Sequence, residues 1–310
     1  MNIDFDKKTA TSLSVIAKEQ GIVKFHFNEA QEYIHKQLQQ QLHDQKKVRL
    51  VILKGRQQGC TTYVAARYYW NITRQKGRRA FIVTHSGDAS RHVMSITERF
   101  YDYDDDPMKP KTESASQKGM HFANIDSAIT IATAGGRAIG RSHTIHYLHA
   151  SEVAFWPNAS HHMAGLVQAV PNVEGTQIIL ESTANGPTGK FYELWQESFK
   201  PDNPYKGIFV PWFWQKEYQA TPPKDWRANQ ELIEYQQRFG LSDAQIYWAY
   251  QKQQELGDVS LFDQEYPATA EHAFAKPDSQ TFIDLRKIDT KLTIEQSHYP
   301  IVMGVDPARF

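Results

Sequence analysis

The residues with the clearest chemical potential in this chain form a short polar loop, KGRQQGCTT, at positions 54–62. An apolar run at 48–53 precedes the loop, and a helical pattern over 61–75 follows it. Backbone N–H groups in such a loop, together with the N-terminus of the next helix, form a nest that binds phosphate. Gly59 permits a close approach to the backbone, and Thr61 takes the hydroxyl position that ligates Mg²⁺ in the eight-residue phosphate loop. The loop therefore predicts a site for nucleotide phosphates.

The loop departs from the common pattern at two positions. Lys54 stands where the pattern begins with glycine, and Cys60 stands where it carries its lysine. Without that lysine the loop lacks the charge that holds the β- and γ-phosphates, so Lys54 and Arg56 are the candidates to supply it. An ordinary strand-to-helix turn that contains a glycine is the alternative interpretation.

Polar residues also follow two other apolar runs, at the points where strands would end. Glu152 lies just past the run at 144–149, and Ser182 and Thr183 follow the run at 177–180. The carboxyl ends of neighbouring parallel strands meet in one crevice, so these side chains are expected to face the phosphate loop. In P-loop enzymes a carboxylate in the position of Glu152 organises the metal ion and the attacking water.

Strand-like and helix-like segments alternate through the first two-thirds of the chain. The expected strands cover 48–53, 80–84, 128–133, 144–149 and 177–180, and the expected helices include 61–75 and 89–101. This alternation predicts an α/β fold with a mainly parallel central sheet flanked by helices. After Pro211 the chain becomes aromatic, a Pro-Pro pair interrupts it, and amphipathic helices are expected over 229–239 and 242–256. We therefore expect a P-loop NTPase core followed by a smaller helical subdomain.

The composition excludes several classes of protein. Apolar residues make up 40% of the 310 positions, which is enough for a large core and excludes disorder as the main state. One cysteine forms neither an internal disulfide nor a cysteine-based zinc site, so a cytoplasmic protein is expected. The sequence has no apolar run of about 18 residues and no signal-peptide pattern at its start, so neither secretion nor a membrane partner is expected.

The formal net charge is zero, but the charges are unevenly distributed. Residues 46–99 contain twelve basic residues against two acidic ones, whereas residues 217–271 carry a net charge of −6. The basic segment suits a polyanionic partner such as DNA, and charges spread over solvated faces are the alternative. The acidic run at 102–106 follows at once; we interpret it as a solvated loop, with a cation site as the alternative.

Five motifs in one order resemble a known family. They are KGRQQGCTT at 54–62, HASEVAFW at 149–156, ESTANG at 181–186, FDQEYP at 262–267 and GVDPAR at 304–309. Together they resemble the large terminase subunit of tailed bacteriophages and prophages, a DNA-packaging motor with an N-terminal ATPase and a C-terminal nuclease. The resemblance implies an N-terminal extension at 1–26, the ATPase core at 27–210, a helical subdomain or linker at 211–295, and the start of an RNase H-like nuclease domain at 296–310.

The resemblance also implies roles for individual residues. Glu152 matches the Walker B carboxylate that activates water, and Ser151 replaces an aspartate, so that it would reach the metal only through a water molecule. Arg56 matches a proposed arginine finger acting in cis, and Ser182 and Thr183 match the motif that couples hydrolysis to DNA movement. ATP and Mg²⁺ would occupy a Walker A loop, with Thr61 on the metal, that comprises Lys54, Gly55, Arg56, Gln57, Gln58, Gly59, Cys60, Thr61 and Thr62.

Four further residues take roles from the same resemblance. Gln31, in FNEAQ at 27–31, resembles the glutamine that reads the adenine, with an exposed helical glutamine as the alternative. Arg137 and Arg141 are candidates for a finger donated to the neighbouring subunit; a contact to DNA phosphate or a solvated loop is the alternative. Asp306 matches the first metal-binding aspartate of the nuclease. Two-metal hydrolysis needs several carboxylates, and the others would lie beyond Phe310, so this chain is expected not to cut DNA.

These inferences predict an ATP-hydrolysing motor that translocates double-stranded DNA into a procapsid in a bacterial host cell. The implied partners are double-stranded DNA, the portal protein, the small terminase subunit and further copies of the chain in a homo-oligomeric ring. A helicase-like nucleic-acid ATPase and a non-hydrolysing P-loop assembly module are the two alternatives. The aromatic cluster at 205–218 is expected to pack between subdomains, with base stacking as the alternative.

Overall fold

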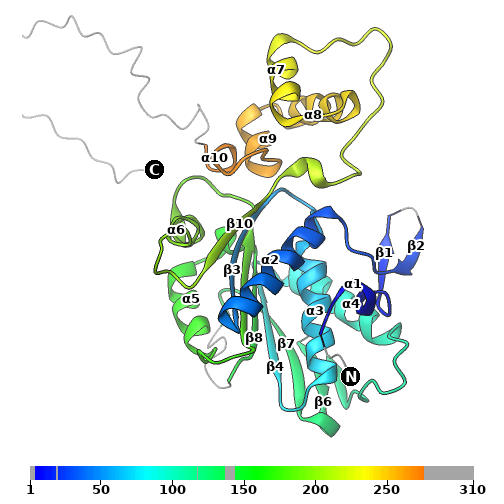
Figure 1. Ribbon diagram of the computed structural model, residues 1–310, viewed down its shortest axis with the longest axis vertical. Helices are drawn as coiled ribbons and strands as arrows, with labels where there is room; N and C mark the ends of the chain where they lie inside the picture. Colours follow the sequence, from blue (N-terminus) through cyan, green and yellow to red (C-terminus); the bar gives the residue numbers. More distant parts are fainter. Residues whose placement is uncertain (1–3, 19, 117, 137–143, 276–310) are drawn as a thin grey trace, which may run out of the picture. The chain divides into compact units, whose positions relative to one another are not determined.

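The computed structural model describes residues 4–18, 20–116, 118–136 and 144–275, which belong to one compact unit ending at Ala275 (Figure 1). Asp306 and the predicted start of a nuclease domain at 296–310 lie outside the described residues, as do Arg137 and Arg141. The predicted domain boundaries stay predictions.

The centre of the fold is an eight-stranded sheet. Its first six strands are parallel and its last two are antiparallel, which confirms the expected α/β fold with a mainly parallel sheet. The order across the sheet is β10 (Lys206–Val210), β3 (Val48–Lys54), β9 (Gln177–Ser182), β8 (Tyr147–Ser151), β4 (Arg79–Thr84), β7 (Ser127–Thr133), β6 (Gly119–Phe122) and β5 (Ser114–Ser116).

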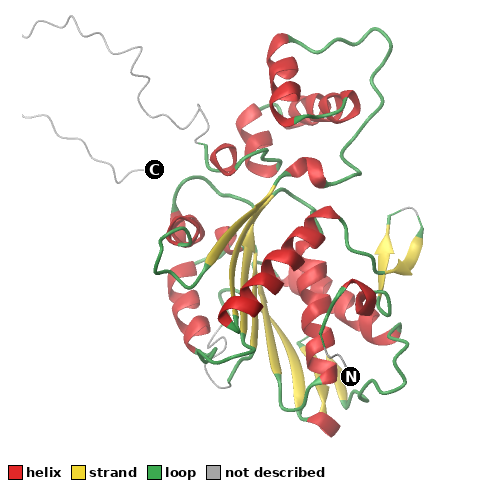
Figure 2. Ribbon diagram, viewed as in Figure 1, coloured by secondary structure: helices red, strands yellow, loops and turns green. Residues whose placement is uncertain are grey.

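Helices cover both faces of this sheet (Figure 2). One face carries α2 (Glu29–Gln45), α3 (Cys60–Arg74) and α4 (Gly87–Asp102), and the other carries α5 (Ala159–Gln168) and α6 (Gly189–Glu197). Alternate residues of β3 supply the two cores, because successive side chains of a strand point to opposite faces. Leu50 and Ile52 join the first apolar cluster, whereas Val51 and Leu53 join the second. The arrangement is therefore a three-layer sandwich with the sheet as its middle layer.

The N-terminal residues pack onto the first of these faces. Helix α1 (Lys7–Ala10) is followed by the hairpin of β1 (Ser14–Ala17) and β2 (Gly21–Lys24). Phe5 and Leu13 are fully buried in the same core as α2 and α3.

Strand β8 begins and ends later than the sequence indicates. The expected strand covers 144–149, but β8 covers Tyr147–Ser151, because its pairing with β4 runs from Ala80 opposite Tyr147 to Val83 opposite Ala150. Ser151 is therefore the last residue of the strand, and Glu152 follows directly.

The residues after β10 form a set of short helices around aromatic side chains. These helices are η3 (Trp212–Trp214), α7 (Gln230–Phe239), α8 (Asp243–Leu256), α9 (Val259–Glu265) and α10 (Ala270–Ala273). Trp212 is fully buried and stacks on Trp248 with ring centroids 5.1 Å apart, and Tyr218 stacks on the same indole at 4.4 Å. For Trp212 and Tyr218 the structure confirms packing and not exposure for base stacking.

Several basic side chains of residues 46–99 are buried or form ion pairs within the fold. Arg49 and Arg67 are buried, and Arg74 pairs with Asp104 at 2.7 Å. The Asp104 side chain is fully buried, so the prediction that the acidic run is a solvated loop is wrong at this residue. The count of twelve basic residues therefore overstates the charge that this segment presents to a partner.

Within the described residues, no helix combines the length and the apolar character needed to cross a membrane.

Candidate functional site

A cavity of about 720 Å³ lies at the carboxyl ends of β3 and β8, beside the start of α3. Strands β3, β9 and β8 are neighbours, so the residues that follow them meet at one edge of the sheet, as the sequence predicts. The predicted site residues that line this cavity are Lys54, Arg56, Gln57, Gln58, Gly59, Cys60, Thr61, Thr62, Ser151, Glu152 and Thr183.

The polar loop turns sharply into the N-terminus of α3. Gly59 has a φ of +74° and takes the N-cap position of the helix, with no side chain bonded to the first free N–H groups. An uncapped helix start of this kind attracts anions, because its N–H groups and the helix dipole both point at the ligand. The backbone geometry of the loop therefore suits phosphate.

Contacts from the C-terminal helical residues hold the loop in place. Gln58 Nε2 donates to the Trp212 carbonyl at 3.1 Å, and the Tyr218 hydroxyl donates to the Arg56 carbonyl at 2.8 Å. At Gly55 a Cβ atom would lie 3.1 Å from the Trp212 Cα, so a side chain there meets the backbone of η3. The loop and the aromatic helical residues form one packed unit.

Gln31 lies against the loop from α2. It is buried, so the alternative of an exposed helical glutamine is wrong. Its Oε1 accepts the Asn28 backbone N–H at 2.9 Å as part of a capping box, and its Nε2 donates to the Gly59 carbonyl at 3.0 Å. In this structure Gln31 therefore joins the start of α2 to the phosphate loop, and its adenine-reading role stays a prediction.

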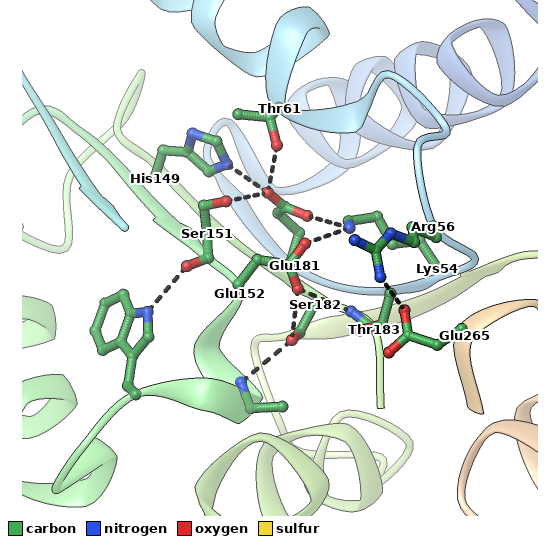
Figure 3. A network of polar contacts seen from close by, with 12 residues as sticks. Lys54, Arg56, Thr61, His149, Ser151, Glu152, Glu181, Ser182, Thr183 and Glu265 are labelled. Atoms are coloured by element: carbon green, nitrogen blue, oxygen red, sulfur yellow. Dashed lines mark hydrogen bonds and ion pairs between the residues drawn. The ribbon is translucent and has the colours of Figure 1, made fainter. Parts of the chain in front are cut away.

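Lys54 places its ammonium between two carboxylates of the neighbouring strands (Figure 3). Its Nζ lies 2.7 Å from Glu152 Oε1 and 3.2 Å from Glu181 Oε2, and its side chain is 6% exposed. Burial on its own would lower the pKa of Lys54, but the two carboxylates raise it above its ordinary value of 10.5. Lys54 is therefore a charged ammonium at the mouth of the phosphate loop.

Cys60 occupies the position of the lysine in the common pattern but does not supply its positive charge. It is the first residue of α3 and is buried in the core below the loop. Burial raises the pKa of the Cys60 thiol far above its ordinary value, so the group stays a neutral thiol. Of the two residues predicted to supply the missing charge, Lys54 contacts the carboxylates of the site and Arg56 pairs with Glu265.

Glu152 stands directly after β8 in a left-handed backbone conformation, with a φ of +56°. Non-glycine residues in this region store strain, which is often found at functional sites. Its Oε2 accepts the Ser182 hydroxyl and the Thr183 backbone N–H, both at 3.2 Å. Ser182 Oγ in turn accepts the Ala154 N–H at 3.2 Å. The two residues of the predicted coupling motif therefore contact the predicted catalytic carboxylate directly.

Glu181, the residue before that motif, is absent from the sequence-based set of site residues. Its carboxylate is fully buried, and its Oε1 accepts the hydroxyls of Thr61 at 2.8 Å and Ser151 at 2.6 Å. His149 Nε2, also missed, lies 3.4 Å from the same oxygen. A carboxylate that closes the apolar run QIIL is the sequence signal that points to Glu181.

Glu181 is ionised despite its burial. Burial on its own would raise its pKa, but the Lys54 ammonium, followed by the contacts from His149 and Ser151, lowers the pKa well below its ordinary value of 4.5. Its Oε2 has the ion pair with Lys54 but no hydrogen bond. The site therefore holds two carboxylates that both contact one ammonium.

Arg56 pairs with a carboxylate outside this cluster. Its guanidinium lies 3.3 Å from Glu265 of α9 and its side chain is 57% exposed. The backbone of the same two residues is joined as well, because the Arg56 N–H donates to the Glu265 carbonyl at 2.8 Å. Arg56 therefore links the loop to the helical residues in this structure.

The oxygen donors around Thr61 suit a hard divalent cation. Mg²⁺ prefers oxygen ligands and is commonly held by one or two carboxylates together with substrate phosphates. The hydroxyl oxygens of Thr61 and Ser151 each lie within hydrogen-bond distance of Glu181 Oε1, and Glu181 Oε2 has no hydrogen bond. Nowhere in the described ranges do three or more His, Cys, Asp or Glu side chains gather as a metal site. The donor set fits a cation whose remaining ligands come from a bound phosphate.

Comparisons with solved structures identify the fold. The ATPase domain of the large terminase of Thermus phage P74-26 aligns with a TM-score of 0.56 and 14% identity, over 82% of this chain and 95% of that domain. The large terminase of bacteriophage HK97 aligns with a TM-score of 0.60 and 11% identity, over 84% of this chain and 53% of that protein. No protein-family model matches the sequence, and a search of curated proteins finds no match. The described part of this chain therefore has the fold of a large terminase ATPase domain.

Proposed function

We propose that this chain is the ATPase part of a viral DNA-packaging motor, which uses ATP hydrolysis to move double-stranded DNA into a procapsid. The observation that carries the proposal is the contact of Lys54 with Glu152 and Glu181 beside the uncapped start of α3. The motifs in the sequence and the terminase fold support the same function.

ATP would place its phosphates on the loop from Lys54 to Thr62. The free N–H groups at the start of α3 supply hydrogen bonds, and Lys54 supplies the positive charge that Cys60 lacks. In this structure the Lys54 ammonium contacts two carboxylates. A bound nucleotide phosphate would replace part of these contacts with its own contact to Lys54. Thr61 and its neighbours would hold Mg²⁺, which neutralises phosphate charge when bound.

Glu152 would orient the attacking water and accept its proton. The carboxylate lines the cavity, and its two oxygens are fixed by Lys54 on one side and by Ser182 and Thr183 on the other. A change in the charge near Glu152 would reach the 182–183 backbone through one hydrogen bond. This contact supports a coupling role for Ser182 and Thr183.

An arginine would stabilise the charge that develops on the transferring phosphoryl group. Arg56 lines the cavity and acts in cis in this proposal, after it leaves Glu265. Arg137 and Arg141 are the proposed fingers toward a neighbouring subunit, and they lie outside the described residues. The proposed assembly is a ring of copies on the portal protein, with the small terminase subunit as a further partner.

The Glu152→Gln substitution tests the catalytic assignment. Gln keeps the size of the side chain but does not accept a proton, so ATP turnover is expected to fall by at least about 10²-fold. Affinity for a non-hydrolysable ATP analogue is expected to remain. Glu217→Gln is the matched control, because Glu217 lines the same cavity and pairs with the exposed Lys18. Turnover in the Glu152 variant equal to that of the control would remove the assignment.

A further inference from the structure

The second motif of this site lacks a negative charge at its first position. Strand β8 ends at Ser151, and Glu152 follows. A serine provides a hydroxyl to the site, but it does not provide a negative charge that attracts a cation. If the chain binds a magnesium nucleotide, another group must supply the negative charge and orient the ligands of the cation.

The neighbouring strand brings a carboxylate to the same place. The register of β8 and β9 sets Ser151 directly opposite Glu181. The Ser151 hydroxyl donates to Glu181 Oε1 at 2.6 Å, so the serine contacts the carboxylate instead of replacing it (Figure 3). The missing charge is therefore present one strand away.

The hydrogen bond between Glu181 and Thr61 has a defined direction. The Thr61 hydroxyl donates its single proton to Glu181 Oε1, at 2.8 Å. The two lone pairs of Thr61 Oγ1 are not used in the bond to Glu181, and Thr61 lines the cavity. An acceptor in this position prepares the hydroxyl oxygen to bind a cation.

We propose that Glu181 is the positioning residue that orients the Thr61 hydroxyl and supplies the second negative charge for a divalent cation at the nucleotide site. Glu181 takes the place of the acid that Ser151 does not provide. This inference rests on the proposed function, because it requires a magnesium nucleotide in the cavity.

The burial of Glu181 supports a specific role. An ionised carboxylate without exposure to water is costly to bury, and an apolar residue of the same size is often more stable in a core. A purely structural role would make Glu181 equally important with and without a metal. A positioning role makes its effect depend on the metal.

The test is the affinity for a fluorescent non-hydrolysable ATP analogue, measured with Mg²⁺ and with EDTA. In the Glu181→Gln variant the gain in affinity that Mg²⁺ gives is expected to shrink by about 10- to 100-fold, the usual effect of losing an outer ligand. Affinity in EDTA is expected to stay the same or to rise, because one negative charge near the phosphates is removed.

The variant Ser151→Asp/Glu181→Gln moves the charge back across one strand. It keeps the number of buried charges, so it can be tested if Glu181→Gln alone does not fold. It is expected to regain most of the increase in affinity that Mg²⁺ gives. Glu217 lines the same cavity and pairs with Lys18, so Glu217→Gln is expected to behave as wild type.

Two results would overturn the inference: an equal loss of affinity in Mg²⁺ and in EDTA for Glu181→Gln, or no regain in the double variant. Absence of analogue binding by the wild-type protein would instead overturn the proposed function itself.

Discussion

Lys54→Met removes the ammonium at the centre of the site while keeping an unbranched side chain of similar length. The side chains of Lys54 and Glu181 are 6% and 0% exposed, and that of Glu152 is 23% exposed. Removing one partner of a buried ion pair costs about 3–5 kcal/mol, because the other charge stays buried without compensation. An exposed pair is worth only about 0–1 kcal/mol. We therefore expect Lys54→Met to lower the free energy of unfolding by about 3–5 kcal/mol at pH 7.

The assay is urea unfolding of the wild type, Lys54→Met, Glu181→Gln and the double variant. Because the cost comes from an uncompensated Glu181 charge, the double variant is expected to be more stable than the sum of the single changes predicts, with a coupling of about 0.5–3 kcal/mol. Strictly additive effects, or a loss below about 1 kcal/mol for Lys54→Met, would refute the description of a buried ion pair.

The pH dependence of the free energy of unfolding tests whether the Lys54–Glu181 pair stabilises the fold. The pKa of Glu181 is lowered by Lys54 in the folded protein, so the stability that it contributes is present above its ordinary pKa of 4.5 and is lost as the pH falls below that value. Lys54→Met removes this cause, so the difference in stability between the wild type and the variant is expected to narrow as the pH falls below 4.5. A constant difference from pH 7 to pH 3.5 would contradict the account.

Two further predictions concern the residues around the loop. Gly59→Ala brings a Cβ atom to 2.6 Å from Gln31 Nε2, whereas Gly257 has a similar φ and no atom within 4 Å. Gly257→Ala is expected to cost about 1–2 kcal/mol for the left-handed backbone and Gly59→Ala more, in urea unfolding; equal losses would argue against the packing of Gln31 on the loop. Burial, followed by Arg67, lowers the pKa of His35 to about 4, so stability is expected to fall as the pH drops from 6.5 toward 4. His35→Gln is expected to flatten this part of the profile of melting temperature against pH, and an unchanged slope would contradict it.

The sequence predicts the interior strands of the sheet better than its edge strands. Strand β3 is buried at all seven positions, and such strands appear in a sequence as continuous apolar runs. Strands β5 and β6 are three and four residues long at the antiparallel edge, too short to give a periodic pattern. The late start of β8 depends on its register with β4, which no local pattern contains.

The candidate site was predictable where one segment carries it. The loop from Lys54 to Thr62 and Glu152 after its strand are features of single segments, and the structure brings them to one cavity. Glu181 was missed because its role depends on strand order: β9 lies between β3 and β8, so its carboxylate reaches Thr61 and Ser151 together. A count of local charge also failed, because it does not show that Arg74 pairs with Asp104.

ATP turnover with and without duplex DNA, at several salt concentrations, tests the central claim most directly. The account predicts Mg²⁺-dependent turnover that rises when duplex DNA is added, and a stimulation that weakens steeply with salt, because the proposed contacts to DNA are mainly to phosphates. ATP turnover by the Glu152→Gln protein is the background rate with which the wild-type rate is compared. Wild-type turnover no higher than this background in the presence of duplex DNA would contradict the account.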